Sequence, residues 1–245
     1  MQFNFNKKKY IVTRPNFIPL VGFLFALIIL LSLSLWQFKR LEWKTGLINE
    51  RISRFESKTT FLESIEIPSE SEFQRVKVTG ILLNEYELFM PALSKNGNNG
   101  YHILTILKSS SWGNIIYDTG WIPLHKRERN ERINNLISGE KEFEAVIRIP
   151  GRKGRFQPDN DIVGNFWFFV DPLQIQNFTK LEVEQTFYLE SVNNGPNGYP
   201  LGNQTRIYIR NNHLQYAFTW FMMSILWFGM SVYFIYKILE KKKIE

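Results

Sequence analysis

Histidine is the residue type in this chain best suited to bind a metal, and it occurs only three times, as His102, His125 and His213. A three-histidine zinc site would need all of them, and His213 borders a long apolar run, so we do not expect one. The chain has no cysteine, which excludes disulfides, thiol nucleophiles and iron–sulfur clusters. No phosphate-binding glycine loop, nucleophile elbow or H-E-x-x-H pattern is present. The sequence therefore predicts no catalytic constellation and no enzyme.

His213 is the most informative of these residues, because it stands at the start of an apolar run, within Asn211–Tyr216. A histidine at membrane depth is costly unless it has a partner. A neutral imidazole at the mouth of a membrane span could bind haem iron. The alternative is an interfacial histidine that contacts headgroups or water.

A second candidate cluster combines acidic and basic residues in one loop. Asp159-Asn160-Asp161 resembles an oxygen-ligand cluster but lacks the glycine and the closing glutamate of a calcium loop. We expect a turn stabilised by side-chain-to-backbone hydrogen bonds. The preceding Arg152, Lys153 and Arg155 could pair with carboxylates of a ligand or partner protein, or simply be solvated.

Two uncharged apolar runs, which must position the candidate residues, cover Phe17–Leu35 and Leu214–Tyr236. At about 1.5 Å per residue, each is long enough to cross the roughly 30 Å core of a bilayer as a helix. Tyrosine and tryptophan lie near both ends of the second run, as at membrane interfaces. A cleaved signal peptide is the alternative for the first run, but Trp36–Arg40 offers no small-residue cleavage site.

Charge predicts the orientation of these spans. The excess of positive charge lies in the two tails, and the remainder is close to neutral, which argues against a nucleic-acid partner. The positive-inside rule places the tails in the cytoplasm. We therefore expect a multi-pass membrane protein whose central domain lies in the periplasm of a bacterium or in the intermembrane space of a mitochondrion. No Arg- and Ser-rich presequence is present, which favours the bacterial inner membrane. Its expected parts are a basic tail over 1–16, transmembrane helices over 17–35 and 214–236, an extracytoplasmic domain over 36–213, and a basic tail over 237–245.

The central domain is predicted to be α+β and mainly β, as a small barrel or sandwich. Periodicity predicts helices over Gln37–Ser57, Arg127–Ser138 and Pro172–Phe178. Strands are predicted for the segments Arg75–Gly80, Tyr86–Met90 (ended by Pro91), Tyr101–Lys108, Gly113–Thr119, Glu142–Ile149, Phe166–Val170, Phe187–Glu190 and Thr205–Ile209.

A series of short motifs follows the same order as in a known family. They are Trp36-Gln37-x-x-Arg40-x-x-Trp43-Lys44, Arg75-Val76-x-Val78-Thr79-Gly80, Gly100-Tyr101-His102, Gly120-Trp121-Ile122-Pro123, Phe156-x-Pro158-x-Asn160, Asn165-x-Trp167-Phe168 and Asn212-His213-Leu214-Gln215-Tyr216-Ala217-x-Thr219-Trp220. Together they make the chain resemble the Surfeit-locus-one (Shy-one-like) family over nearly its whole length. Each motif alone is weak evidence for the family, but the order of all seven between two apolar spans is specific to it.

The resemblance implies an assembly factor, not an enzyme, that helps insert haem a into the catalytic subunit of cytochrome c oxidase. It implies His213 as the iron ligand, with that subunit and other assembly factors as partners. Tyr216, Trp220 and Phe221 would then cover the macrocycle, and Arg210 would pair with the propionates. A cofactor-free scaffold that stabilises oxidase assembly intermediates is the alternative.

The motif tryptophans have two interpretations. Trp121, in Gly120–Pro123, is expected to pack at a strand end inside the domain. Trp36 is expected to anchor the membrane interface, with lining of the haem site as the alternative.

Overall fold

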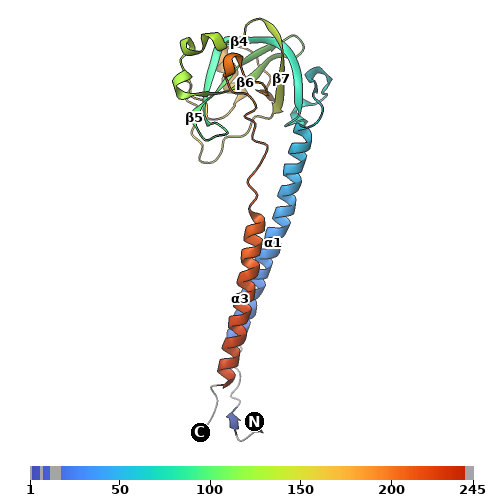
Figure 1. The fold of residues 1–245 in the computed structure, drawn as a ribbon, viewed down its shortest axis with the longest axis vertical. Coiled ribbons are helices and arrows are strands. Elements are labelled where there is room, and N and C mark those ends of the chain that lie inside the picture. Colours follow the sequence, from blue (N-terminus) through green and yellow to red (C-terminus); the bar gives the residue numbers. More distant parts are fainter. Residues whose placement is uncertain (1, 6–7, 12–17, 241–245) are drawn as a thin grey trace. The chain divides into compact units, whose positions relative to one another are not determined.

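The computed structural model describes residues 2–5, 8–11 and 18–240. The chain divides into two compact units (Figure 1). The first, here the helical unit, comprises Met1–Leu47 and Ile209–Glu245, and the second, the β unit, comprises Ile48–Tyr208. Parts of both predicted basic tails, including Lys7 and Arg14, and the first residue of the predicted first span, Phe17, lie outside the described residues.

The helical unit consists of two long helices and a small hairpin. Helix α1 spans Ile18–Phe55 and runs on into the β unit, and α3 spans His213–Glu240. The hairpin joins β1, Gln2–Phe5, to β2, Lys8–Ile11. The predicted continuation of the first span into a helix over 37–57 is confirmed, because α1 is unbroken across Gly46.

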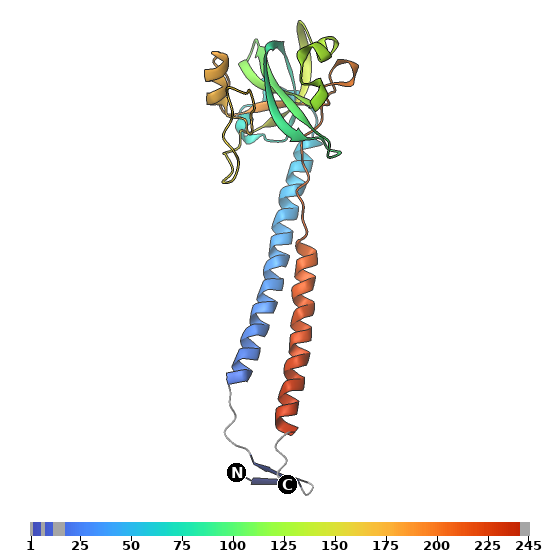
Figure 2. The same cartoon turned by 90° about the vertical axis from the view of Figure 1, so that its left-hand side faces the viewer.

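Helices α1 and α3 lie side by side within the helical unit (Figure 2) and run antiparallel. Their facing residues recur at three- and four-residue steps, the spacing of paired helices. This seam consists of Phe23, Leu27, Leu30, Ser34, Gln37, Leu41 and Lys44 on α1 and His213, Ala217, Trp220, Ser224, Trp227 and Ser231 on α3. Small seam residues let the two backbones approach: the Ser34 hydroxyl donates to the Ala217 carbonyl oxygen at 3.0 Å. Further along, Trp227 Nε1 donates to the Phe23 carbonyl oxygen at 3.1 Å.

The remaining surface of both helices is apolar and exposed. By length and composition both are able to cross a membrane, and only 6% and 11% of their most apolar stretches are buried. A core helix of a soluble protein would be mostly buried, so this exposure is consistent with a membrane protein.

The β unit is built on a six-stranded sheet of order β3-β4-β5-β6-β8-β7. The strands are β3 (Thr60–Phe61), β4 (Arg75–Leu93), β5 (Asn99–Ser109), β6 (Gly113–Pro123), β7 (Glu140–Arg148) and β8 (Tyr188–Ser191). Pairing is antiparallel except for β3–β4 and β6–β8. Strand β7 pairs with β8 on one side and with β4 on the other, so the series of paired strands that leaves β4 through β5 comes back to β4. The mainly β prediction for this domain is confirmed.

Short helices connect these strands. Helix α2 spans Pro172–Thr179, one residue longer than predicted, and Asp171 caps it by accepting from Gln174 N at 3.1 Å. Lys180 ends it in the left-handed conformation. The 3₁₀ helices are η1 (Leu62–Ser64), η2 (Pro68–Glu70), η3 (Leu124–Lys126), η4 (Arg129–Asn135) and η5 (Pro196–Gly198).

Two predicted elements are altered by tertiary contacts. The α-helix predicted over 127–138 is wrong: η4 is a 3₁₀ helix, and the buried Arg132 side chain donates to the Lys126 and Arg127 carbonyl oxygens. Nor does β4 stop at Pro91. Proline has no N–H to donate to a neighbouring strand. On the side of β4 that faces away from β5, β7 pairs only with residues 75–81, so no strand there requires a donor from Pro91.

Two other predicted strands are absent. Residues 166–170 form only isolated bridges at Phe166, because Asn160 Oδ1 accepts from the amides of Phe168 and Phe169 instead of a neighbouring strand. Residues 205–209 form no ladder, and the Thr205 hydroxyl donates instead to Glu190 Oε2 at 2.6 Å. In the first segment a side-chain oxygen therefore takes the backbone amides that a strand would pair.

Candidate functional site

His213 begins α3, and its ring is held by the facing helix. Its Nδ1 lies 2.7 Å from Gln37 Oε1, and Gln37 is 9% exposed. An amide oxygen only accepts, so Nδ1 donates to it, and in a neutral imidazole with this tautomer Nε2 carries the lone pair. A hydrogen bond at one ring nitrogen that frees the other is how proteins orient histidine toward a metal.

Polar and cationic groups surround this histidine. The Asn212 amide is oriented so that its oxygen faces the Arg210 guanidinium. This oxygen accepts from Arg210 Nε and Nη2, each at 2.8 Å. Lys44 Nζ donates to the Arg210 carbonyl oxygen. Asn211 Nδ2 donates to the Thr45 hydroxyl at 3.2 Å, and Asn211 Oδ1 is buried without a partner among the described residues. The mouth of the helix pair therefore has two cations and one unsatisfied buried acceptor.

The three aromatic residues predicted to cover a macrocycle take different places on α3. Tyr216 and Phe221 are exposed, at 53% and 45%. Trp220 is half-buried in the seam, two turns beyond His213. The structure brings together His213 and Gln37, a pair that the sequence motifs did not predict. The three- and four-residue spacing of the seam was the signal that could have paired them.

The β unit contains a second histidine pair, at His102 and Asp118. His102 Nδ1 lies 2.6 Å from Asp118 Oδ2, and their side chains are 13% and 2% exposed. Burial alone would lower the pKa of His102, but the charge and hydrogen bond of Asp118, with the charge of Glu190, raise it overall. Asp118 Oδ1 accepts from Gly120 N at 2.9 Å.

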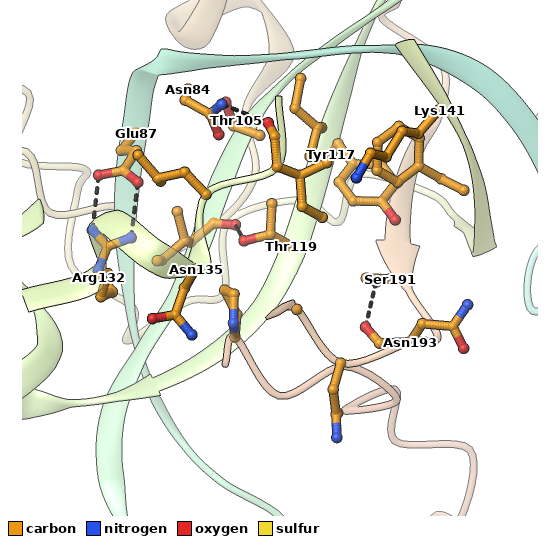
Figure 3. A pocket seen from close by; sticks show the side chains of 18 of the residues that line it. Asn84, Glu87, Thr105, Tyr117, Thr119, Arg132, Asn135, Lys141, Ser191 and Asn193 are labelled. Atoms are coloured by element: carbon orange, nitrogen blue, oxygen red, sulfur yellow. Dashed lines mark hydrogen bonds and ion pairs between the residues drawn. The ribbon is translucent and has the colours of Figure 1, made fainter. Parts of the chain in front are cut away.

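A cavity of about 170 Å³ opens within the same unit (Figure 3). Arg132, 2% exposed, faces Glu87 on its wall and donates to both carboxylate oxygens, at 2.9 and 2.8 Å. Tyr117 lines the cavity as well, and burial raises its pKa strongly. The guanidinium and the carboxylate are paired to each other, and the rest of the lining combines hydroxyl and amide groups with the charged residues Lys141, Glu142 and Glu144.

The acidic loop forms a turn, as predicted. Gly164 N donates to Asp161 Oδ1 at 2.9 Å, and Lys153 pairs with Asp159 at 2.5 Å. Within the described residues, no three His, Cys, Asp or Glu side chains are placed to hold a metal ion.

Most of the chain, including Gln37 and His213, matches a known family. A model of the SURF1 family matches residues 24–225. The chain belongs to the SURF1 family. It is 29% identical to Surfeit locus protein 1 of Takifugu rubripes, over 81% of this chain and 90% of that protein. Identity is 30% to the Xenopus tropicalis protein of that name, over 78% and 67%, and 27% to the human one, over 80% and 72%. These relatives are eukaryotic.

Several motif residues of this SURF1 chain serve the fold of the β unit. Trp167 is fully buried, and its Nε1 donates to Asn165 Oδ1 at 2.8 Å. Trp121, 3% exposed, donates to the Ala92 carbonyl oxygen at 3.1 Å. Gly120 has a φ of +118°, and a Cβ there would lie 2.2 Å from the Leu201 carbonyl oxygen. The prediction that Trp121 packs inside the domain is confirmed.

The SURF1 motif after the first apolar run lies on the surface of α1. Trp36 and Trp43 are 55% and 51% exposed, and the Arg40 guanidinium lies 3.9 Å from the Trp43 ring centroid. Gln37 and Lys44 of this motif turn into the seam, Gln37 toward His213 and Lys44 toward the Arg210 carbonyl oxygen. The motif therefore combines an exposed aromatic surface with one buried polar group.

Proposed function

We propose that this protein is an assembly factor for the haem–copper cytochrome c oxidase that holds haem a at the membrane for insertion into the catalytic subunit. Membership of the SURF1 family supports the assembly role. The observation that carries the haem proposal is the His213–Gln37 pair, which fixes the imidazole and leaves Nε2 able to bind iron. Bound haem a would supply a redox-active iron and a broad apolar ring.

The residues around His213 fit such a group. Arg210 is exposed, and Lys44 lies beside its carbonyl group, so both cations suit the propionates. Tyr216, Trp220 and Phe221 suit the apolar ring. We propose that His213 holds the iron, that these aromatic side chains exclude water from the ring, and that Gln37 holds the imidazole in place.

The proposed role requires a membrane location. We propose that α1 and α3 span an inner membrane, with both termini on the cytoplasmic side and the β unit, shaped as a small barrel, on the other. The catalytic subunit of the oxidase and its other assembly factors are the proposed partners. No reaction is assigned to the protein.

A cofactor-free scaffold is the second candidate, and one observation favours it. The His213–Gln37 bond, with the Asn211–Thr45 bond, also joins the start of α3 to α1. The same contacts would then serve only helix pairing, and the exposed aromatic residues of α3 would contact oxidase subunits.

Purification from cells that make haem a distinguishes these candidates. The wild-type protein should carry a chromophore with a haem a spectrum, and His213→Ala should lose it. His213→Met should retain a shifted spectrum, because a thioether also binds haem iron. His125→Ala, which removes an exposed histidine of the β unit, is the matched control. A colourless wild-type protein that still co-purifies with oxidase subunits would establish the scaffold. Unchanged oxidase assembly on deletion would contradict both.

A further inference from the structure

Two tight turns of the β unit present apolar side chains to solvent. Phe156 is 94% exposed and Val163 is 100% exposed, the two highest values among the exposed large apolar residues of the described chain. Single exposed apolar residues are ordinary on protein surfaces. Here, however, the backbone around each one is fixed by specific hydrogen bonds.

The first turn holds Arg155 and Phe156 at its corners. Gln157 N donates to the Gly154 carbonyl oxygen, and Gly154 N donates to Gln157 Oε1, both at 3.0 Å. Gln157 Nε2 also donates to the Phe168 carbonyl oxygen. The turn is thus closed on itself and fastened to the body of the unit.

The second turn holds Ile162 and Val163 and is fastened in the same way. Asp161 and Phe166 exchange two backbone hydrogen bonds, at 2.8 and 2.9 Å, and Asp161 Oδ1 accepts from Gly164 N. Ile162 is 41% exposed. Both turns are therefore braced against residues 166–168, and both direct their apolar side chains away from the core.

Basic residues flank the first turn. Lys153 is paired with Asp159, whereas Arg152 has no ion-pair partner among the described residues. The Arg155 guanidinium lies 5.8 Å from the Phe156 ring centroid. The tip of the loop therefore combines an exposed aromatic ring with two cations, Arg152 and Arg155, that form no ion pair with a carboxylate of the described residues.

We propose that this loop, residues 152–163, docks on the surface of an anionic lipid bilayer. Phe156 and Val163 would enter the interface, where aromatic side chains are favoured, and Arg152 and Arg155 would contact headgroup phosphates. The inference rests on the membrane anchoring in the proposed function, because a unit tethered at both ends to spanning helices stays near a bilayer. An acidic protein face is the competing partner. Protein interfaces need a continuous packed area, whereas a bilayer accepts side chains presented singly at turn tips.

A cysteine label on the full chain in lipid nanodiscs tests the proposal, because the native sequence has no cysteine. Val163→Cys carries a polarity-sensitive fluorophore and leaves Phe156 intact. Ile133→Cys, at an exposed position of η4 (63%), is the matched control. In nanodiscs with phosphatidylglycerol, the label at 163 should shift to the blue and be quenched by doxyl-labelled lipid. The label at 133 should be quenched only by aqueous iodide.

Substitutions in the Val163→Cys background separate the contribution of the arginine charges from that of the exposed aromatic ring. The label at 163 reports the ratio of loops docked on the bilayer to loops free in water. Arg152→Ser and Arg155→Ser should each lower this ratio about fivefold, and nanodiscs of pure phosphatidylcholine should lower it further. Phe156→Ser should also release the label. Equal iodide quenching at 163 and 133 in every lipid would overturn the docking and leave the anchoring intact. Shielding of position 163 only after an oxidase subunit is added would assign the loop to a protein partner instead. Failure of the chain to enter nanodiscs would overturn both anchoring and docking.

Discussion

The helical unit and the β unit each contain one histidine whose Nδ1 is held by a short hydrogen bond, and the two partners differ in charge. In the β unit the partner of His102 is the carboxylate of Asp118, at 2.6 Å. In the helical unit the partner of His213 is the neutral amide of Gln37, at 2.7 Å. A carboxylate stabilises the imidazolium, which has no lone pair for a metal. A neutral amide orients the ring without contributing a charge, so the two histidines suit different tasks.

The two units also differ in how they bury tryptophan. The β unit encloses Trp121 and Trp167 in its interior, whereas the helical unit exposes Trp36 and Trp43. Motif residues of one type thus serve stability in one unit and present a surface in the other. The predictions below test this division.

The largest effect is expected from truncating a buried tryptophan. Trp167→Ala should cost about 3–5 kcal/mol, because it leaves a cavity and removes the donor to Asn165 Oδ1. Its thermal unfolding midpoint should fall by about 10 °C. Trp36→Ala, at an exposed site, should change stability by less than about 0.5 kcal/mol. Equal losses in the two variants would mean that Trp36 also supports the fold.

A smaller effect is expected from removing the amide that orients His213. Gln37→Leu should weaken haem a binding about 10- to 100-fold, as loss of the hydrogen bond behind a metal ligand does. Spectral titration of the purified protein measures this affinity. Ser34→Ala, which removes a seam hydrogen bond one turn away, should bind haem a as the wild type does. Unchanged affinity in Gln37→Leu would show that the bond serves only helix pairing.

The smallest effect is expected from neutralising the partner of His102. The pKa of His102 is raised in the fold, so its pairing stabilises the protein fully below about pH 6.5 and less as the pH rises through the folded-state pKa. Asp118→Asn should cost about 1 kcal/mol at pH 6 and progressively less at higher pH. Unfolding midpoints from pH 5.5 to 9 measure this difference. Glu190 and Arg206 should be left unchanged in this variant, because their charges also shift the pKa of His102.

A constant difference between wild type and Asp118→Asn across that range would contradict a proton-linked role. The bond from Gly120 N to Asp118 Oδ1 would then account for the loss. In that case the contrast between the two histidine pairs would concern geometry alone.

Much of the fold could be predicted from local pattern. The long helices follow from uninterrupted apolar runs, β7 follows from alternating residues, and β5 and β6 follow from two neighbouring runs that suit a hairpin. The predictions failed where a distant side chain decided the backbone. Arg132 pairs with Glu87, far away in sequence, from a segment that forms 3₁₀ turns where the sequence pattern predicts an α-helix. Asn160 takes the amides of residues 168 and 169 away from a predicted strand.

The sequence by itself determined the two apolar helices, the mainly β domain between them and His213 as the residue of interest. It did so because hydrophobic periodicity and motif order are local properties of the chain. Only the tertiary structure decided that Gln37 contacts His213 and that Asp118 contacts His102. Residues 37 and 213 lie far apart in sequence, and the hydrogen bond that selects the free ring nitrogen forms only when the two helices pack together.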